Sequence, residues 1–514
     1  MKKRGMRLRR YFAKYRSSKL VIGFIIFVLF SSCNKPQEQI QNETILARIG
    51  DRTISVNEFI RRAEYTPRPA YCRGEDYVQR KIVLNSLIAE KLLALEAGAD
   101  NELTRTPEYQ LYVQGRKEQA MRQWQYHQEA YQRVQLDTSE IKAVYNLAGR
   151  TYKIAYYALK DSNIARLASQ ELQRGGKSFE QLHNETGSLE GIPQREVAWD
   201  SPEEEAIHQA LFSGELQKGQ ILGPLSVREN SYVMMKILGW TDKVAVSDMQ
   251  VRTRWNDVKE NLTHKKAGKL YEQYAAGVMR GKTLEFSPAT FRKMVEIVAP
   301  FYLKSSEEKQ AALQQQFWGN ENEENVLSQM GAGVDAILEE PLFRIDAQVW
   351  TVRDLEREIK VHPLVFRKKN LQQGEFAEQF KLAIVDMVRD RYLTQEAYKK
   401  GYDQAEAVQR NVSMWRDNLL FLYQQTQYLK SLGKQHNFSK DYLQIIETDL
   451  NPYLDSLQAK YHDVIEINTD VFEKIKLTAI DMLVLRRNDP FPVMVPSFPV
   501  ITTDNRLDYG RKMN

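Results

Sequence analysis

The 514-residue sequence has few of the residues from which metal centres, disulfides and cofactor sites are built. It contains two cysteines, Cys33 and Cys72, and seven histidines. It has no CxxC, HExxH, P-loop or GxGxxG pattern, and the histidines show no metal-ligand spacing with acids or cysteines. No cofactor and no metal ion are therefore expected, and Cys72 is expected to be a free thiol, buried or semi-exposed.

The chain also lacks a strong excess of one charge outside its first residues. Residues 1–32 carry nine Lys or Arg and no acid, whereas the remainder has 64 basic against 67 acidic residues. A nearly neutral body gives no electrostatic footprint for phosphate backbones, so no nucleic-acid partner is expected.

The N-terminal apolar run is too short to span a bilayer. "LVIGFIIFVLF" covers residues 20–30, eleven residues against the roughly 20 that a transmembrane helix needs. A basic stretch before it and "SSC" after it resemble a lipoprotein signal peptide, with cleavage before Cys33 and lipidation of that residue. Phe30 departs from the usual aliphatic residue, so an uncleaved anchor or an ordinary secretory signal stays open. Asn34 in place of Asp favours the outer membrane, facing the periplasm, although surface display also stays open.

Two distant stretches of the sequence resemble each other. "ILARIGDRTISVNEFIRRAEYTP" (45–67) and "PLFRIDAQVWTVRDLEREIKVHP" (341–363) align at a constant offset of 296, and 86–97 aligns with 386–397 at an offset of 300. Each reads as two short strands and a helix that begins after Ser55 or Thr351, with an acid three residues on. The alternative is a chance likeness between amphipathic helices. We interpret the stretches as two copies of one mainly helical module.

These openings resemble the N-terminal segments of SurA- and PrsA-type foldases. "ARIGDRTISVNEFIRR" fits the phrase with which that family opens the helical lobe that holds unfolded clients. The resemblance implies two helical lobes that bind extended polypeptide.

The region between the copies has a different pattern. "YKIAYYAL" (152–159), "GKSFEQL" and "ALFSGELQKGQILGPLSV" give the order β-α-α-β-α-β-β, which resembles a parvulin-type peptidyl-prolyl isomerase domain over roughly 150–241. The predicted fold class is therefore α+β and mainly helical, with two related SurA-N-like lobes and an inserted parvulin-like α/β domain.

The resemblance places the family's catalytic positions on residues of other types. Its two histidines fall at Tyr156 and Val233, its acid at Glu196, its polar or thiol residue near Ser188, and its proline pocket near Glu203 and Ile207. An apolar residue at 233 would be buried at low cost on the inner face of a strand. We expect the isomerase site to be lost, and His183 and His208 to be surface or edge residues.

The tail after residue 480 contains four prolines that alternate with apolar residues, which favours extended geometry. A strap packed across a helical lobe and a flexible partner-binding tail are both open. The expected organisation is a signal peptide (1–32), a tether (33–44), a first helical lobe (45–150), a degenerate parvulin-like domain (151–242), a long helix with connecting helices (243–335), a second lobe (336–480) and a Pro-rich tail (481–514).

The resemblance implies a membrane-tethered periplasmic chaperone that binds unfolded envelope or outer-membrane proteins. Two alternatives stay open. One is an active peptidyl-prolyl isomerase with a rearranged site, and the other is a structural lipoprotein that scaffolds an envelope complex.

Overall fold

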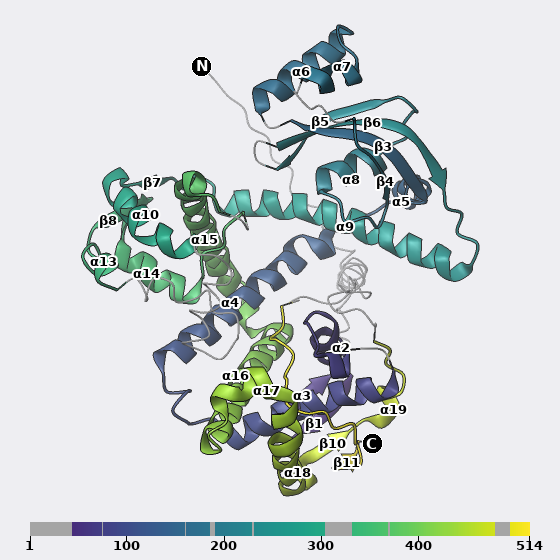
Figure 1. The fold of residues 1–514 in the computed structure, drawn as a ribbon. Coiled ribbons are helices and arrows are strands. Elements are labelled where there is room, and N and C mark those ends of the chain that lie inside the picture. The colour runs from purple at the N-terminus through teal and green to yellow at the C-terminus, as the bar shows by residue number, and fades with distance from the viewer. Residues whose placement is uncertain are drawn as a thin grey trace, which may run out of the picture.

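The computed structural model describes residues 44–73, 76–159, 161–185, 191–228, 231–303, 331–368, 371–477 and 494–513. The described part of the chain is mainly helical, as predicted, and it contains three small sheets. Figure 1 shows the inserted unit at the top right, the first helical core at the bottom and the second helical core at the left. Cys33 and the preceding signal segment lie outside the described residues.

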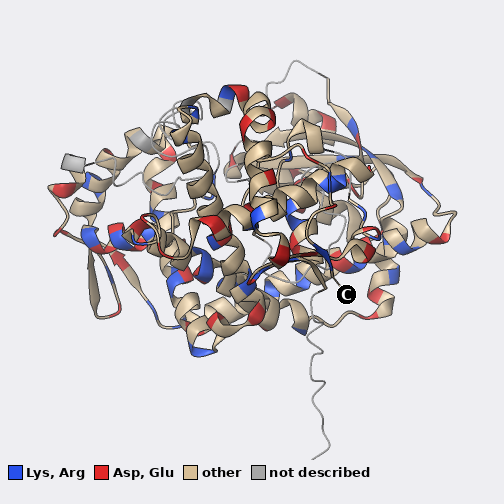
Figure 2. Cartoon of the chain, turned by 90° about the horizontal axis from the view of Figure 1, so that it is seen from below, with Lys and Arg blue, Asp and Glu red and all other residues tan. Residues whose placement is uncertain are grey.

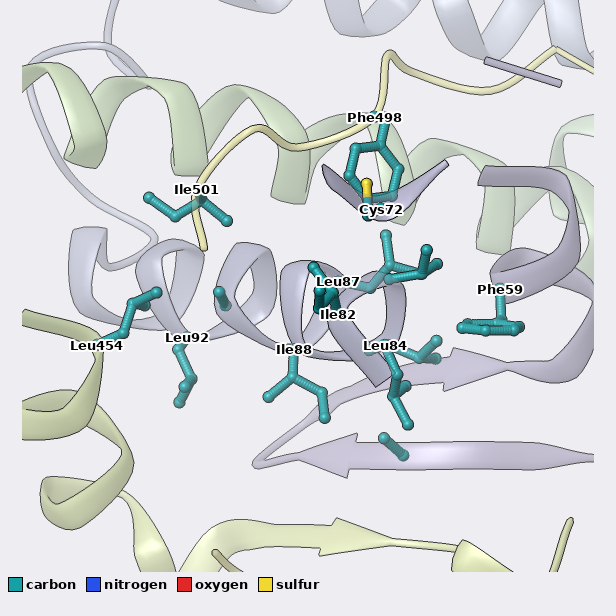
Figure 3. Close-up of a cluster of buried hydrophobic side chains, with 14 of the residues drawn as sticks. Phe59, Cys72, Ile82, Leu84, Leu87, Ile88, Leu92, Leu454, Phe498 and Ile501 are labelled. Atoms are coloured by element: carbon teal, nitrogen blue, oxygen red, sulfur yellow. The ribbon is translucent and has the colours of Figure 1, made fainter. Parts of the chain in front are cut away.

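The first helical core is built around a hairpin and a capped helix. Strands β1 (Ile45–Ile49) and β2 (Arg52–Ser55) lead into α2 (Val56–Glu64), where the Ser55 side chain accepts from the Glu58 amide. Helix α3 (Tyr77–Ala97) follows, and buried leucines and isoleucines along it form the centre of this core (Figure 3). Cys72 is fully buried here, and its thiol donates to the Pro69 carbonyl at 3.5 Å.

The second helical core repeats that opening. Strands β8 (Pro341–Ile345) and β9 (Gln348–Thr351) lead into α14 (Val352–Val361), with Thr351 capping the helix and Asp354 returning the hydrogen bond. Gly50 and Asp346 both have positive φ, at 61° and 53°, at the first position of the two-residue turn in each hairpin. Both types tolerate the left-handed region, so the two turns are built alike. Helix α15 (Phe376–Lys399) corresponds to α3.

Different segments complete the two sheets. In the first, β10 (Ile465–Ile467) pairs antiparallel with β1, and β11 (Arg511–Lys512) adds parallel to β10, giving the order β11-β10-β1-β2. In the second, β7 (Leu284–Phe286) pairs with β8, giving β7-β8-β9. Helices α10 (Pro288–Tyr302) and α13 (Gly331–Asp335) cover this second core.

The third helix of each repeat packs against the other repeat. Helix α4 (Pro107–Glu129) contacts α14, α15 and α16, whereas α16 (Glu406–Ser431) contacts α3 as well as α4. Phe421 and Leu429 of α16 therefore belong to the first core. The expected division at 336–480 differs from this packing, because a local sequence pattern does not specify which distant apolar face a helix covers.

The remaining C-terminal elements also join the first core. Helix α17 (Phe438–Ile445), a π-helical turn (Ile446–Leu450), α18 (Asn451–Lys460) and α19 (Thr469–Phe472) pack there. Residues 494–508 carry no helix or strand and run across the same core, with Phe498 and Ile501 buried. The described part of the tail is thus a packed strap. Short 3-10 turns lie at Ala70–Cys72, Tyr131–Arg133, Gln373–Glu375, Tyr402–Gln404, Gln435–Asn437 and His462–Val464.

The inserted unit is a four-stranded antiparallel sheet with helices on both faces. Its elements are β3 (Arg150–Leu159), α6 (Ser162–Arg174), α7 (Phe179–Glu185), β4 (Gln194–Ala198), α8 (Glu205–Phe212), β5 (Ile221–Arg228) and β6 (Ser231–Asp242). The strand order is β4-β3-β6-β5. The predicted order of elements is confirmed. Helices α6 and α7 pack on one face, and α8 packs on the other.

Two helices connect this unit to the helical cores. Helix α5 (Thr138–Leu147) precedes it, and α9 (Asp248–Val278) follows it and contacts α4, α5 and α15. Acidic and basic residues are interspersed over all parts of the chain seen in Figure 2. Within the described ranges, no helix has the length and apolar character needed to cross a bilayer.

Candidate functional site

One face of the inserted sheet gathers three of the predicted site positions. Tyr156, Ile207 and Val233 belong to a single apolar cluster between the sheet and α8. On the central strands, Tyr156 lies opposite Met235 and Val233 lies opposite Ala158. Val233 is buried, as its place on an alternating strand predicted.

An ion pair lies beside this cluster. The Arg195 guanidinium contacts both carboxylate oxygens of Glu203 at 2.7 Å, and it lies 4.8 Å from the centre of the Tyr156 ring. The Glu203 side chain is only 7% exposed. A two-pronged pair of this kind is geometrically specific, and the ring face adds a cation–π contact. Glu203 therefore contributes a partnered charge at a position where the resemblance implied an apolar proline pocket.

The other predicted positions do not join this group. Glu196 alternates with Arg195 on β4, is exposed, and lies opposite the exposed Lys153 in the register of β3. It therefore faces away from Tyr156. Ser188 lies outside the described residues, so its place relative to the cluster is not part of the structure.

The two histidines of the unit have structural surroundings. His183 is buried, with its ring centre 5.2 Å from that of Tyr157, so the expectation of a surface or edge residue was wrong for it. The reason is that Leu182 and Phe179 place this side of α7 on the sheet. His208 is half-buried, and its Nε2–H donates to the Trp199 carbonyl at 3.0 Å. Burial lowers the pKa of His208.

A second candidate site lies in the first helical core. A cavity of about 720 Å³ is enclosed by the β1–β2 hairpin, α2, the start of α4 and the first half of α16. Its floor carries Lys91, whose Nζ lies 2.9 Å from Glu58 and 3.0 Å from Asp417. Arg52 holds the other Asp417 oxygen at 2.9 Å.

The charges at this floor shift each other's protonation equilibria. Burial raises the pKa of Glu58, and the nearby Lys91 offsets this only in part. Burial opposes the charge on Lys91, but the Asp417 and Glu58 carboxylates outweigh it and raise its pKa. A carboxyl with a raised pKa that lines a cavity is a recurrent feature of functional sites, and also of structural ion networks.

A deeper ion pair lies behind the cavity. Arg62 donates to both oxygens of Glu90 at 2.8 and 2.6 Å, and both side chains are 0% exposed. Asn418 of α16 donates to the same carboxylate at 2.9 Å. Burial opposes ionisation of Glu90, yet Arg62 lowers its pKa. Arg62 also donates to the Ser497 carbonyl at 2.7 Å, so the pair connects α2, α3, α16 and the strap.

Two further hollows lie at junctions between parts of the chain. One of about 580 Å³ separates α4 from the second core, and one of about 590 Å³ lies between α8 and α9. Near the first, His362 Nε2 donates to Glu118 at 2.6 Å. Burial opposes ionisation of Glu118, but hydrogen bonds led by the one from His362 lower its pKa.

Sequence reasoning missed Arg195 and the Arg62–Glu90 pair. Alternation along "QREVA" could have placed Arg195 on the same face as the buried Val197. The partner of Arg62 lies 28 positions away, beyond the reach of periodicity. Across the described ranges, no group of three or more His, Cys, Asp or Glu residues is arranged to hold a metal ion.

The chain was compared with known proteins in three ways. No family model matches it, and no curated protein and no solved structure is significantly similar to it.

Proposed function

We propose that the protein is a membrane-tethered chaperone of the cell envelope that holds unfolded polypeptides, and that its inserted unit is a parvulin-type domain without isomerase activity. The proposal combines the resemblance of the sequence with the contacts around Tyr156. The tether is a lipid on Cys33 at the outer membrane, facing the periplasm. The clients are unfolded envelope or outer-membrane proteins.

The observation that carries the proposal is the Arg195–Glu203 pair beside Tyr156. Rotation about an X–Pro bond crosses a barrier of roughly 18–20 kcal/mol, so a catalyst must favour the twisted amide over the planar one. A proline ring needs an apolar pocket for this. Here a hydrogen-bonded ion pair lies next to the apolar cluster, and separating it to admit a ring would leave the half-buried charges unpaired.

Client binding is supported by the way the cores meet. The hollows are lined by both apolar and charged side chains, and they lie at junctions between separate parts of the chain. Several mixed surfaces of this kind suit weak contacts at many points of an extended polypeptide. A single deep apolar pocket would suit a small ligand better.

The test measures two activities of the purified chain that follows the signal peptide. Cis–trans isomerisation of a short X–Pro peptide is followed with and without the protein, and aggregation of an unfolded outer-membrane protein is followed at several-fold molar excess. We expect no acceleration of isomerisation and clear suppression of aggregation. Acceleration that is lost in Glu203→Gln but kept in Lys153→Gln, on the opposite face, would establish a rearranged isomerase site instead. Lack of suppression, together with one stoichiometric partner in a pull-down, would favour the scaffold.

A further inference from the structure

The strap follows helix α16, and buried side chains hold its backbone at regular intervals. The carbonyl of Met494 accepts from Asn411 at 2.8 Å, that of Ser497 from Arg62 at 2.7 Å, and that of Val500 from Gln425 at 3.1 Å. The three acceptors are every third residue of the strap. Since a carbonyl is common to all residues, these contacts do not depend on the side chains of the strap.

The donors have a matching repeat on the helix. Asn411, Asn418 and Gln425 are seven residues apart on α16, and Asn418 acts through Glu90, which holds Arg62. Seven residues of α-helix advance about 10.5 Å. Three residues of polyproline II advance about 9.3 Å. The two repeats are nearly equal, so a polyproline II chain running along α16 presents one carbonyl to each donor.

The strap sequence favours that geometry. Pro496 and Pro499 fix their own φ, and they restrict the preceding Val495 and Phe498 to extended conformations. Both prolines and Phe498 are buried, so one edge of the strap faces the core while its carbonyls face the donors. Figure 3 shows Phe498 and Ile501 of the strap lying against α3.

The strap shields its donors from water. With the strap in place, Asn411 is 4% exposed, Gln425 is 7% exposed and Arg62 is fully buried, and each donates to a strap carbonyl. Asn85 of α3 adds to the same pattern, since it donates to the carbonyls of Asp504 and Arg506. A chain that replaces the strap recovers these hydrogen bonds when it offers free backbone carbonyls at the same spacing.

We propose that Asn411, Gln425 and the Arg62–Glu90–Asn418 group form a carbonyl track that binds extended, proline-containing segments of client polypeptides, and that residues 494–500 occupy it as an internal stand-in. This deepens the proposed chaperone function and rests on it. A tethered occupant competes at a high effective concentration, so an added peptide binds the intact protein weakly. Clients therefore gain access when the strap is displaced.

The first experiment measures binding of a fluorescent synthetic peptide with the sequence of residues 491–503. We expect weak binding to the unaltered chain and at least tenfold tighter binding to Phe498→Ala, which loosens the strap. Adding Gln425→Leu to that variant should remove the gain, whereas Gln427→Leu, two positions away on the same helix, should keep it. A peptide in which the prolines are alanine should bind several-fold more weakly. Equal binding by all variants would overturn the proposal.

The second experiment leaves the protein unaltered. Hydrogen exchange of residues 494–507 is measured with and without an unfolded outer-membrane protein, while exchange in α3 reports that the core stays folded. We expect faster exchange in the strap when the client is present. Suppressed aggregation with unchanged strap exchange would overturn the track and leave the chaperone function standing. Strap displacement by the peptide without suppression of aggregation would overturn the chaperone function and leave the track.

Discussion

Each helical core carries an ion pair between its short and its long helix. The charge at position 62 is opposite to that at its counterpart 358, and the partner moves by one position, from Glu90 to Arg391, which is the counterpart of Lys91. In the first, Arg62 of α2 pairs with Glu90 of α3, and in the second, Glu358 of α14 pairs with Arg391 of α15. Position 62 corresponds to 358 in the repeat, and 90 and 91 correspond to 390 and 391. The first pair is 0% exposed, whereas the Arg391 side chain is 36% exposed. Both cores thus have an ion pair between the short and the long helix. We expect its contribution to the free energy of unfolding to depend on how far other segments bury it.

The largest expected effect breaks the buried pair. Arg62→Met leaves Glu90 buried without a charged partner and removes a donor from the Ser497 carbonyl. We expect a loss of roughly 3–5 kcal/mol in the free energy of unfolding. Arg391→Met should cost less, about 1 kcal/mol, because the Arg391 end of the pair is open to solvent, which screens it. Urea unfolding, followed by hydrogen exchange of α3 and α15 amides, measures both.

A double variant separates the charge from the packing. Arg62→Met with Glu90→Leu removes both charges, and we expect it to be more stable than Arg62→Met alone, although Asn418 loses an acceptor. If the double variant is the less stable one, packing and not the unpaired carboxylate explains the loss.

An intermediate effect concerns the glycines that precede the outermost strands. Gly510, with φ of 74°, comes before β11, and an added Cβ would lie 2.7 Å from Cγ2 of Ile465. Gly281, with φ of 77°, comes before β7 and has open space around it. Both alanine variants should lose about 1–2 kcal/mol from left-handed strain. Gly510→Ala should lose about 1–3 kcal/mol more from the clash.

Urea midpoints and exchange of the β10 and β8 amides report the two losses separately. Equal losses would mean that the backbone near β11 shifts to relieve the clash with Ile465, and that the edges of the two sheets are equally adaptable.

The smallest expected effect is a difference in pH dependence between two buried acids. The pKa of Glu58 is raised, so its contribution to stability is fully present below about pH 4.3 and is lost as pH rises through its folded pKa. The pKa of Glu118 is lowered, so its contribution is present above about pH 4.3 and is lost as pH falls through its folded pKa. Relative to the unaltered protein, Glu58→Gln should therefore gain stability from pH 4 to pH 8, while Glu118→Gln should lose it. Urea midpoints over this range measure both, and parallel curves would contradict the opposite directions.

Local sequence signals predicted the elements that depend on neighbouring residues. The capped starts at Ser55 and Thr351, the strand and helix order of the inserted unit, and the burial of Val233 follow from periodicity, capping and turn chemistry. Each of these features is determined by residues that are close together in the sequence, so local patterns are enough to predict it.

Features that depend on distant partners could not be predicted in this way. The pattern of α16 shows an apolar face, but nothing local specifies that the face covers α3. The resemblance placed Glu203 in a proline pocket, but nothing local indicated that Arg195 of β4 would pair with it. The sequence allowed the tail to be either a packed strap or a flexible partner-binding segment, because prolines restrict its conformation but do not specify what it packs against.

The closing of the first core by the far end of the chain has a consequence for biosynthesis. Asn85 binds the backbone carbonyls of Asp504 and Arg506, the nearer of which is 419 positions away. The first sheet is completed only when β10 pairs with β1 and β11 pairs with β10. The second core is completed by residues 284–303 and 331–399, all of which emerge earlier from the ribosome or the translocation channel. The first core is therefore synthesised first but completes its folding last. Until then the newly made protein exposes the apolar faces of α2 and α3, and it is itself a substrate for the kind of help that we propose it gives to others.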